Sequence, residues 1–76
     1  MTVRFDRATF AAVLDSIRMA RGLTRRTMAK EAGVAPSTVT RIAQGRSPDA
    51  DTLAALCVWA NLTANTFFIA ASEATS

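Results

Sequence analysis

The sequence predicts an all-α fold, a compact bundle of about five short helices that forms one domain over residues 1–76. Apolar residues recur three and four positions apart along most of the chain, as they do on the buried face of a helix. Residues that cap helices come before these segments, and glycine or asparagine follows them. No segment shows a convincing strand pattern, and a chain this short has room for one core only.

The first helix is expected from about residue 6 to residue 20. Asp6 can cap its N-terminus, and Gly22 can end it in the left-handed conformation. One face of this helix is apolar, and it comprises Phe10, Val13, Leu14 and Ile17. This stripe is expected to form part of the core.

Two shorter helices follow, at about residues 24–31 and 36–43. Thr24 can cap the first of them, and Gly33 ends it. Pro36 suits the first position of the next helix, because a proline there loses no helical hydrogen bond. Ala35, which precedes it, has no side chain that could cap a helix. Val39 and Ile42 are the expected buried residues of this segment.

The last part of the chain predicts two more helices, at about residues 50–60 and 63–71. Asp49 can cap the first of them, and Asn61 can end it. Thr63 can cap the second, which carries Phe67 and Phe68. Residues 72–76 are expected to be frayed.

Charge is distributed unevenly along the chain. The formal net charge is +3, but residues 18–46 hold seven basic residues and one acid, which gives this segment +6. Such a basic segment favours a polyanionic partner, most plausibly nucleic acid. With one cysteine and no histidine, the chain can form neither an internal disulfide nor a zinc site of Cys and His ligands. We therefore expect no metal, no cofactor and no catalytic centre.

A membrane segment is the alternative suggested by the uncharged stretch between Thr52 and Ser72. This stretch is long enough to span a bilayer, but polar residues from Asn61 to Thr66 lie at its centre, where they cost most. A turn between two helices explains them better. The sequence also lacks the features of a secretory signal, so we expect a cytoplasmic protein.

Two short helices joined by a tight turn containing glycine, at about residues 24–43, are typical of a helix-turn-helix motif. The motif residues are Gly22-Leu23-Thr24, Met28-Ala29, Ala32-Gly33-Val34, Ser37-Thr38-Val39-Thr40-Arg41-Ile42, Gly45 and Pro48. In these positions the chain resembles the Cro-type, lambda-repressor-like (XRE) helix-turn-helix family. The resemblance extends over about residues 14–68 and implies a lambda-repressor-like DNA-binding domain.

The resemblance implies that the helix at 36–43 enters the major groove with its N-terminus first. Short side chains on its leading turn permit close approach, and a longer arginine one turn later can contact a guanine. The candidate base contacts are Pro36, Ser37, Thr38, Thr40 and Arg41. The candidate phosphate contacts are Arg25, Arg26, Gln44 and Arg46. Each basic residue could instead be an ordinary solvated side chain.

Three positions depart from the family pattern. An arginine late in the first helix commonly pairs with a glutamate late in the third, but here Arg18 faces Ala43 and needs another partner, either DNA or a different carboxylate. Ala35 replaces the usual serine or threonine cap. Trp59 replaces a small or polar residue, so it either fills the core or is exposed.

The sequence therefore predicts a sequence-specific regulator of transcription that binds double-stranded DNA as a homodimer, on an inverted-repeat operator. A phage repressor, a Cro-like protein and an antitoxin-like autoregulator all remain open. The alternative is a protein-interaction module that keeps the fold without reading DNA. The candidate dimerisation residues, chosen as surplus apolar surface, are Trp59, Leu62, Phe67 and Phe68.

Overall fold

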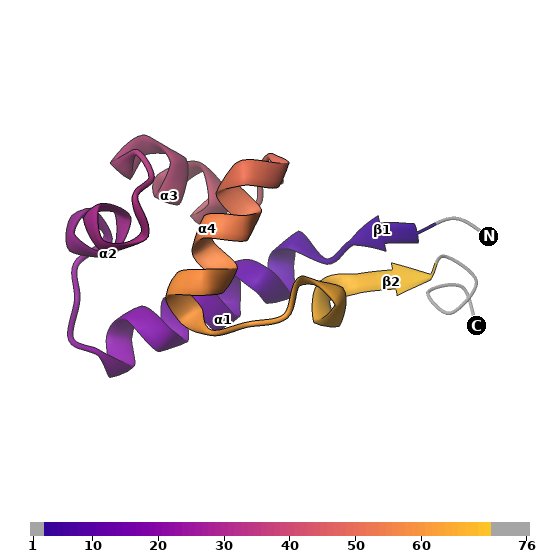
Figure 1. Cartoon of the computed structure of the whole chain (residues 1–76), viewed down its shortest axis with the longest axis horizontal. Helices are drawn as coiled ribbons and strands as arrows, with labels where there is room; N and C mark the ends of the chain where they lie inside the picture. Colours follow the sequence, from indigo (N-terminus) through magenta and orange to yellow (C-terminus); the bar gives the residue numbers. More distant parts are fainter. Residues whose placement is uncertain (1–2, 71–76) are drawn as a thin grey trace.

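The computed structural model describes residues 3–70. Within that range the chain is mostly helical, with a small two-stranded sheet at one end (Figure 1). The elements are β1 (Val3–Phe5), α1 (Arg7–Ala20), α2 (Arg25–Ala32), α3 (Pro36–Ala43), α4 (Ala50–Ala60), the 3₁₀ helix η1 (Ala64–Phe67) and β2 (Phe68–Ala70). The predicted fraying of residues 72–76 lies outside the described residues.

Helices α1 to α4 begin and end close to where the sequence predicts. At three N-termini a side-chain oxygen accepts the backbone N–H three residues later, and the three caps are Asp6, Thr24 and Asp49. Helix α3 begins after Ala35 with no side-chain cap, and Pro36 occupies its first turn. The predicted caps Asp6, Thr24 and Asp49 and the missing cap at Ala35 are thus confirmed. The predicted cap at Thr63 is wrong, because its side chain makes no cap hydrogen bond.

The turn between α2 and α3 depends on Gly33, whose φ of 77° lies in the left-handed region. A residue with a β-carbon adopts that conformation at a cost, whereas glycine does not. The N–H of Val34 then donates to the carbonyl oxygen of Ala29 at 3.0 Å, which closes the end of α2. Asn61 ends α4 in the same left-handed region, with a φ of 58°.

The predicted helix at 63–71 is wrong. One 3₁₀ turn, Ala64–Phe67, is followed by an extended strand that pairs antiparallel with β1, in the register Phe5↔Phe68, Arg4↔Ile69 and Val3↔Ala70. We call this pair of strands the terminal ribbon. Aromatic and β-branched residues such as Phe68 and Ile69 suit a strand, and the sheet partner comes from the opposite end of the chain. Residues 3–70 thus contain four α-helices, whereas about five helices are predicted for the chain.

The core lies between the helices and the base of the terminal ribbon. Its buried residues are Phe10, Leu14, Met28, Ala29, Val39, Ile42, Leu56, Cys57, Ala60 and Phe67. Phe10 and Phe67 meet edge to face with ring centroids 5.1 Å apart, and Phe5 packs on both. Cys57 is buried in this core, and burial raises the pKa of its thiol, which disfavours the reactive thiolate.

Trp59 is half-buried and packs against this core, while its polar edge is held at the surface. Its indole N–H donates to Glu31 of α2 at 3.0 Å. The guanidinium of Arg21 lies 4.6 Å from the ring centroid and donates to the Trp59 carbonyl oxygen. Trp59 therefore connects α4 to the ends of α1 and α2. Among residues 3–70, no helix is both long enough and apolar enough to cross a membrane.

Candidate nucleic-acid interface

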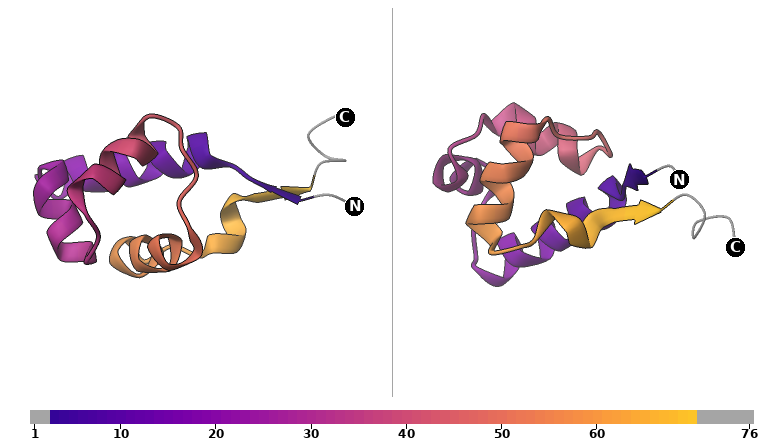
Figure 2. Two further views of the ribbon diagram at one scale, coloured as in Figure 1. Left: turned by 90° about the horizontal axis from the view of Figure 1, so that it is seen from above. Right: turned by 45° about the vertical axis from the view of Figure 1, so that its right-hand side comes forward.

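Helices α2 and α3 pack on each other across the Gly33 turn, and α1 and α4 support them. In Figure 2 the two short helices lie together at the end of the molecule away from the terminal ribbon. This arrangement is that of a helix-turn-helix, in which the second helix presents its free face to DNA.

Helix α3 has one buried face and one exposed face. Val39 and Ile42 are buried, at 6% and 4% exposure. The opposite face is exposed, and its residues are Pro36, Ser37, Thr40, Arg41 and the following Gln44. Because the core occupies the first face, only the second is available to a partner.

Thr38 lies at the edge of this exposed face and is half-buried. It lines a hollow of about 280 Å³ beside α3, together with Arg41, Arg46 and two residues of the α4 N-terminus, Asp49 and Thr52. Of the five candidate base contacts, Thr38 is thus the one that is half-buried, and the other four are exposed.

The carboxylate of Asp49 is already engaged within the protein. It accepts the Thr52 backbone N–H at 2.8 Å, and this hydrogen bond lowers the pKa of Asp49 below its ordinary value. The group is therefore ionised at neutral pH and adds a negative charge to the hollow, close to Arg41 and Arg46. A phosphate is accordingly better placed on the arginine side of the hollow than beside Asp49.

Arg41 is only weakly held in the free protein. Its guanidinium approaches Ser37 Oγ at 3.5 Å, at the outer limit for a hydrogen bond, and the side chain is exposed. The Thr40 hydroxyl donates back to the Pro36 carbonyl oxygen at 3.3 Å. Arg41 can therefore extend from the helix toward a base edge without breaking a strong interaction.

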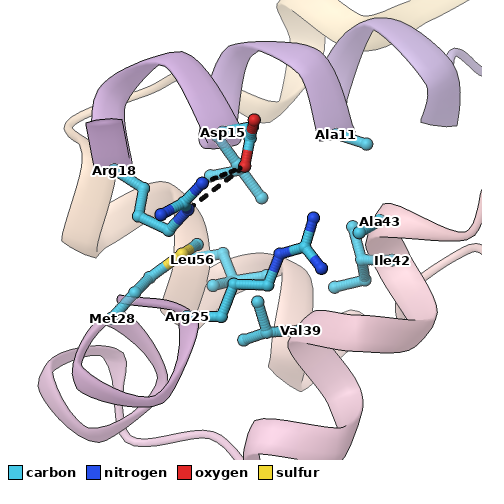
Figure 3. A pocket seen from close by; sticks show the side chains of 10 residues that line it. Ala11, Asp15, Arg18, Arg25, Met28, Val39, Ile42, Ala43 and Leu56 are labelled. Atoms are coloured by element: carbon cyan, nitrogen blue, oxygen red, sulfur yellow. Dashed lines mark hydrogen bonds and ion pairs between the residues drawn. The ribbon is translucent and has the colours of Figure 1, made fainter. Parts of the chain in front are cut away.

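The candidate phosphate contacts flank α3 on two sides. Arg25 and Arg26 occupy the first turn of α2, and Gln44 and Arg46 directly follow α3; all four are exposed. The structure brings Arg25 and Gln44 to a common hollow of about 420 Å³ between α1 and α3. Figure 3 shows the Arg25 guanidinium pointing into the space between these helices, toward Ala43.

Arg18 forms an ion pair with Asp15 of the same helix. Two of its guanidinium nitrogens donate to Asp15 Oδ1, at 3.1 and 2.8 Å (Figure 3). The third donates to the Leu23 carbonyl oxygen at 2.7 Å. Arg18 thereby joins α1 to the start of α2 and is committed to the fold.

Sequence reasoning assigned Gln44 to phosphates alone and missed its position relative to the exposed face. Gln44 lies four residues after Thr40 and seven after Ser37, so the three share one stripe of the helical surface. The spacing of these three residues in the sequence is sufficient to predict that they share this stripe. An amide at this place can contact an adenine edge as well as a phosphate.

The candidate dimerisation residues differ in exposure. Phe67 is 3% exposed and belongs to the core, which removes it from any dimer surface. Trp59 and Leu62 are half-buried against the core. Phe68, on β2, is 42% exposed and is the member of the set most open to a partner.

Comparison with protein families identifies a related domain. A family model described as a helix-turn-helix domain covers residues 9–66. No curated protein matches the chain. In the part of the chain that the structure describes, no group of three His, Cys, Asp or Glu residues is arranged to bind a metal ion. With α2, the Gly33 turn and α3 all inside the matched range, the chain belongs to the helix-turn-helix domain family and is, at this general level, a DNA-binding regulator.

Proposed function

We propose that the protein binds double-stranded DNA in a sequence-specific manner, with α3 as the recognition helix in the major groove. The observation that carries this proposal is the division of α3 into two faces. Val39 and Ile42 hold one face in the core, while Ser37, Thr40 and Arg41 are exposed on the other. Hydroxyl groups and an arginine on a free recognition-helix face are suited to reading base edges.

Positive charge on both sides of α3 supports the same docking. Arg25 and Arg26 begin α2, and Arg46 follows α3, so a duplex lying across α3 meets a basic group at each edge. Contacts to phosphates fix the register of a protein on DNA but carry no sequence information. In this proposal these residues supply affinity, and the exposed face of α3 supplies specificity.

Within this function we propose a homodimer on an inverted-repeat operator, acting as a repressor or an autoregulator of the phage or antitoxin type. Phe68 supports the dimer, because a large aromatic side chain on a terminal strand is left 42% exposed. Paired recognition helices about 34 Å apart would match one turn of DNA. The proposal assigns binding as the whole activity and includes no catalytic role.

Selection from a pool of random duplexes tests the proposal. We expect a short preferred sequence with two-fold symmetry, and we expect affinity for every duplex to fall steeply as salt rises. The variant Arg46→Ala should weaken all sequences about equally and reduce the salt slope by about 1. A protein-interaction module would give no enriched sequence and no salt-dependent binding to duplex.

A further inference from the structure

A second basic surface lies outside the helix-turn-helix, where β1 meets α1. Arg4 and Arg7 are both exposed there. They line a hollow of about 380 Å³ whose wall on the other side is Ser47, from the loop between α3 and α4. Ser47 directly follows Arg46, which is one of the candidate phosphate contacts. Two segments far apart in the sequence thus meet here, and Arg4 and Arg7 lie next to the loop that carries Arg46.

This surface is continuous with the proposed DNA interface. Ala8 lines the hollow of Arg4 and Arg7, and it also lines the neighbouring hollow that contains Arg25 and Gln44. The two hollows therefore meet at Ala8, and one surface path leads from Arg25 at the start of α2, past Gln44 at the end of α3, to Arg7 at the start of α1. A phosphate backbone, which is itself a continuous line of charge, is complementary to such a path.

The position of Arg7 is unfavourable for the free protein. Arg7 is the first residue of α1, and residues 7–10, which form the first helical turn, contain no acid. The N-terminal end of a helix carries partial positive charge, so a cation there is disfavoured and an acid is usual. In α4, by contrast, Asp51 lies in the first turn. A phosphate bound nearby would attract the Arg7 guanidinium and so offset this unfavourable interaction with the helix dipole.

Asp6 lies between the two arginines and opposes their charge in part. Its carboxylate accepts the Thr9 backbone N–H at 3.2 Å, so one oxygen is occupied by the helix cap. The charges of Arg4, Asp6 and Arg7 add to +1. Arg46, one residue from Ser47, adds another positive charge beside the hollow. The surface therefore keeps a net attraction for an anion.

We propose that Arg4 and Arg7 bind DNA phosphates adjacent to those contacted by the loop between α3 and α4, and so extend the footprint of the protein beyond the helix-turn-helix. The inference rests on the proposed function, since it places the same duplex on the same face. It assigns to the β1–α1 junction a role in affinity and none in base recognition.

Salt titration of duplex binding by the variant Arg4→Gln/Arg7→Gln tests this inference. If both arginines contact phosphates, the slope of log affinity against log salt should become shallower by about 2, since each contact contributes about 0.9. Selected and scrambled duplexes should lose affinity by a similar factor. The matched control is Lys30→Gln, which removes a positive charge from an exposed position outside both hollows and should leave the slope unchanged.

The outcomes separate this inference from the proposed function. If the wild-type protein and Arg46→Ala behave as proposed but the double variant has the slope of Lys30→Gln, the role of Arg4 and Arg7 is overturned and the proposed function stands. If the wild-type protein shows no salt-dependent binding to duplex, the proposed function fails first. Thermal unfolding provides the check on folding, because removing Arg7 from the α1 N-terminus should leave stability unchanged or raised.

Discussion

Arg18 donates to Asp15 one turn earlier in α1, with Arg18 Nη2 2.8 Å from Asp15 Oδ1. In the pattern that the family resemblance implies, this arginine pairs across the fold with an acid at the position of Ala43. The ion pair thus lies within one helix, and Ala11 of α1 and Ala43 of α3 line the pocket between the two helices without a charged pair joining them. Arg25 instead points into the space beside Ala43 (Figure 3).

Restoring an acid at this position should create a cross-helix ion pair. In Ala43→Glu the new carboxylate would meet Arg25, and because the site is exposed we expect a coupling energy of about 0.2–1 kcal/mol. A double-mutant cycle with Arg25→Ala, measured by urea unfolding, isolates this energy from the effect of the acid on the end of α3. The variant should also bind DNA more weakly, since it neutralises a candidate phosphate contact. A coupling energy of zero would place Arg25 too far from Ala43.

The cap at Asp49 should make stability depend on pH in acid. The Thr52 backbone N–H holds the pKa of Asp49 below its ordinary value of 3.8, so the ionised carboxylate stabilises the folded state. A depressed pKa contributes stability that is complete above the unfolded-state value and is lost as the pH falls through the folded-state value. Thermal melts of the wild-type protein should therefore lose this contribution below about pH 4.

The matched variant for this prediction is Asp49→Asn, since asparagine caps a helix but does not titrate. The difference in Tm between the wild-type protein and this variant should be constant from pH 7 to pH 5 and should shift against the wild-type protein below pH 4. Other carboxyl groups cancel in the comparison. A difference that stays constant down to pH 2 would contradict the assigned role of the Asp49 charge.

The dimer surface is tested by Phe68→Glu. If Phe68 lies in a homodimer interface, a charge there should shift sedimentation toward the monomer at tens of micromolar protein, because an unpaired charge would be buried. Met19→Glu is the control, since Met19 is 65% exposed at the other end of α1 from the terminal ribbon (Figure 1). Circular dichroism of both variants confirms that they remain folded. A wild-type protein that is monomeric both free and on its selected DNA would exclude the dimer.

The four α-helices could be predicted because their signals are local. Thr24 and Asp49 cap residues three positions away, and Gly33 ends α2 within its own turn. The terminal ribbon could not, because Phe68 adopts a strand only through pairing with Phe5 at the opposite end of the chain. With three residues in each strand, neither segment is long enough to show an alternating pattern.

The exposed face of α3 could also be predicted, since the spacing of Val39 and Ile42 determines which side of the helix remains free. Arg18 and Asp15 are three residues apart, so an ion pair between them within one helix is possible from the sequence. The sequence does not, however, favour Asp15 over other partners for Arg18. Arg4 and Arg7 were missed for a different reason. Along the sequence Asp6 and Asp15 balance the charges of Arg4 and Arg7, whereas the fold places these two arginines next to Ser47.

Arg41 carries the central claim, and the most direct test is the affinity of Arg41→Ala for the selected operator and for a scrambled duplex of equal length. We expect a loss of about 1–3 kcal/mol on the operator, relaxed preference at one base pair in each half-site, and a much smaller loss on the scrambled duplex. Arg41→Lys should restore non-specific affinity without full specificity, because it keeps the charge and loses the planar guanidinium. Equal losses on the two duplexes for Arg41→Ala would contradict the account, since Arg41 would then contact a phosphate rather than a base.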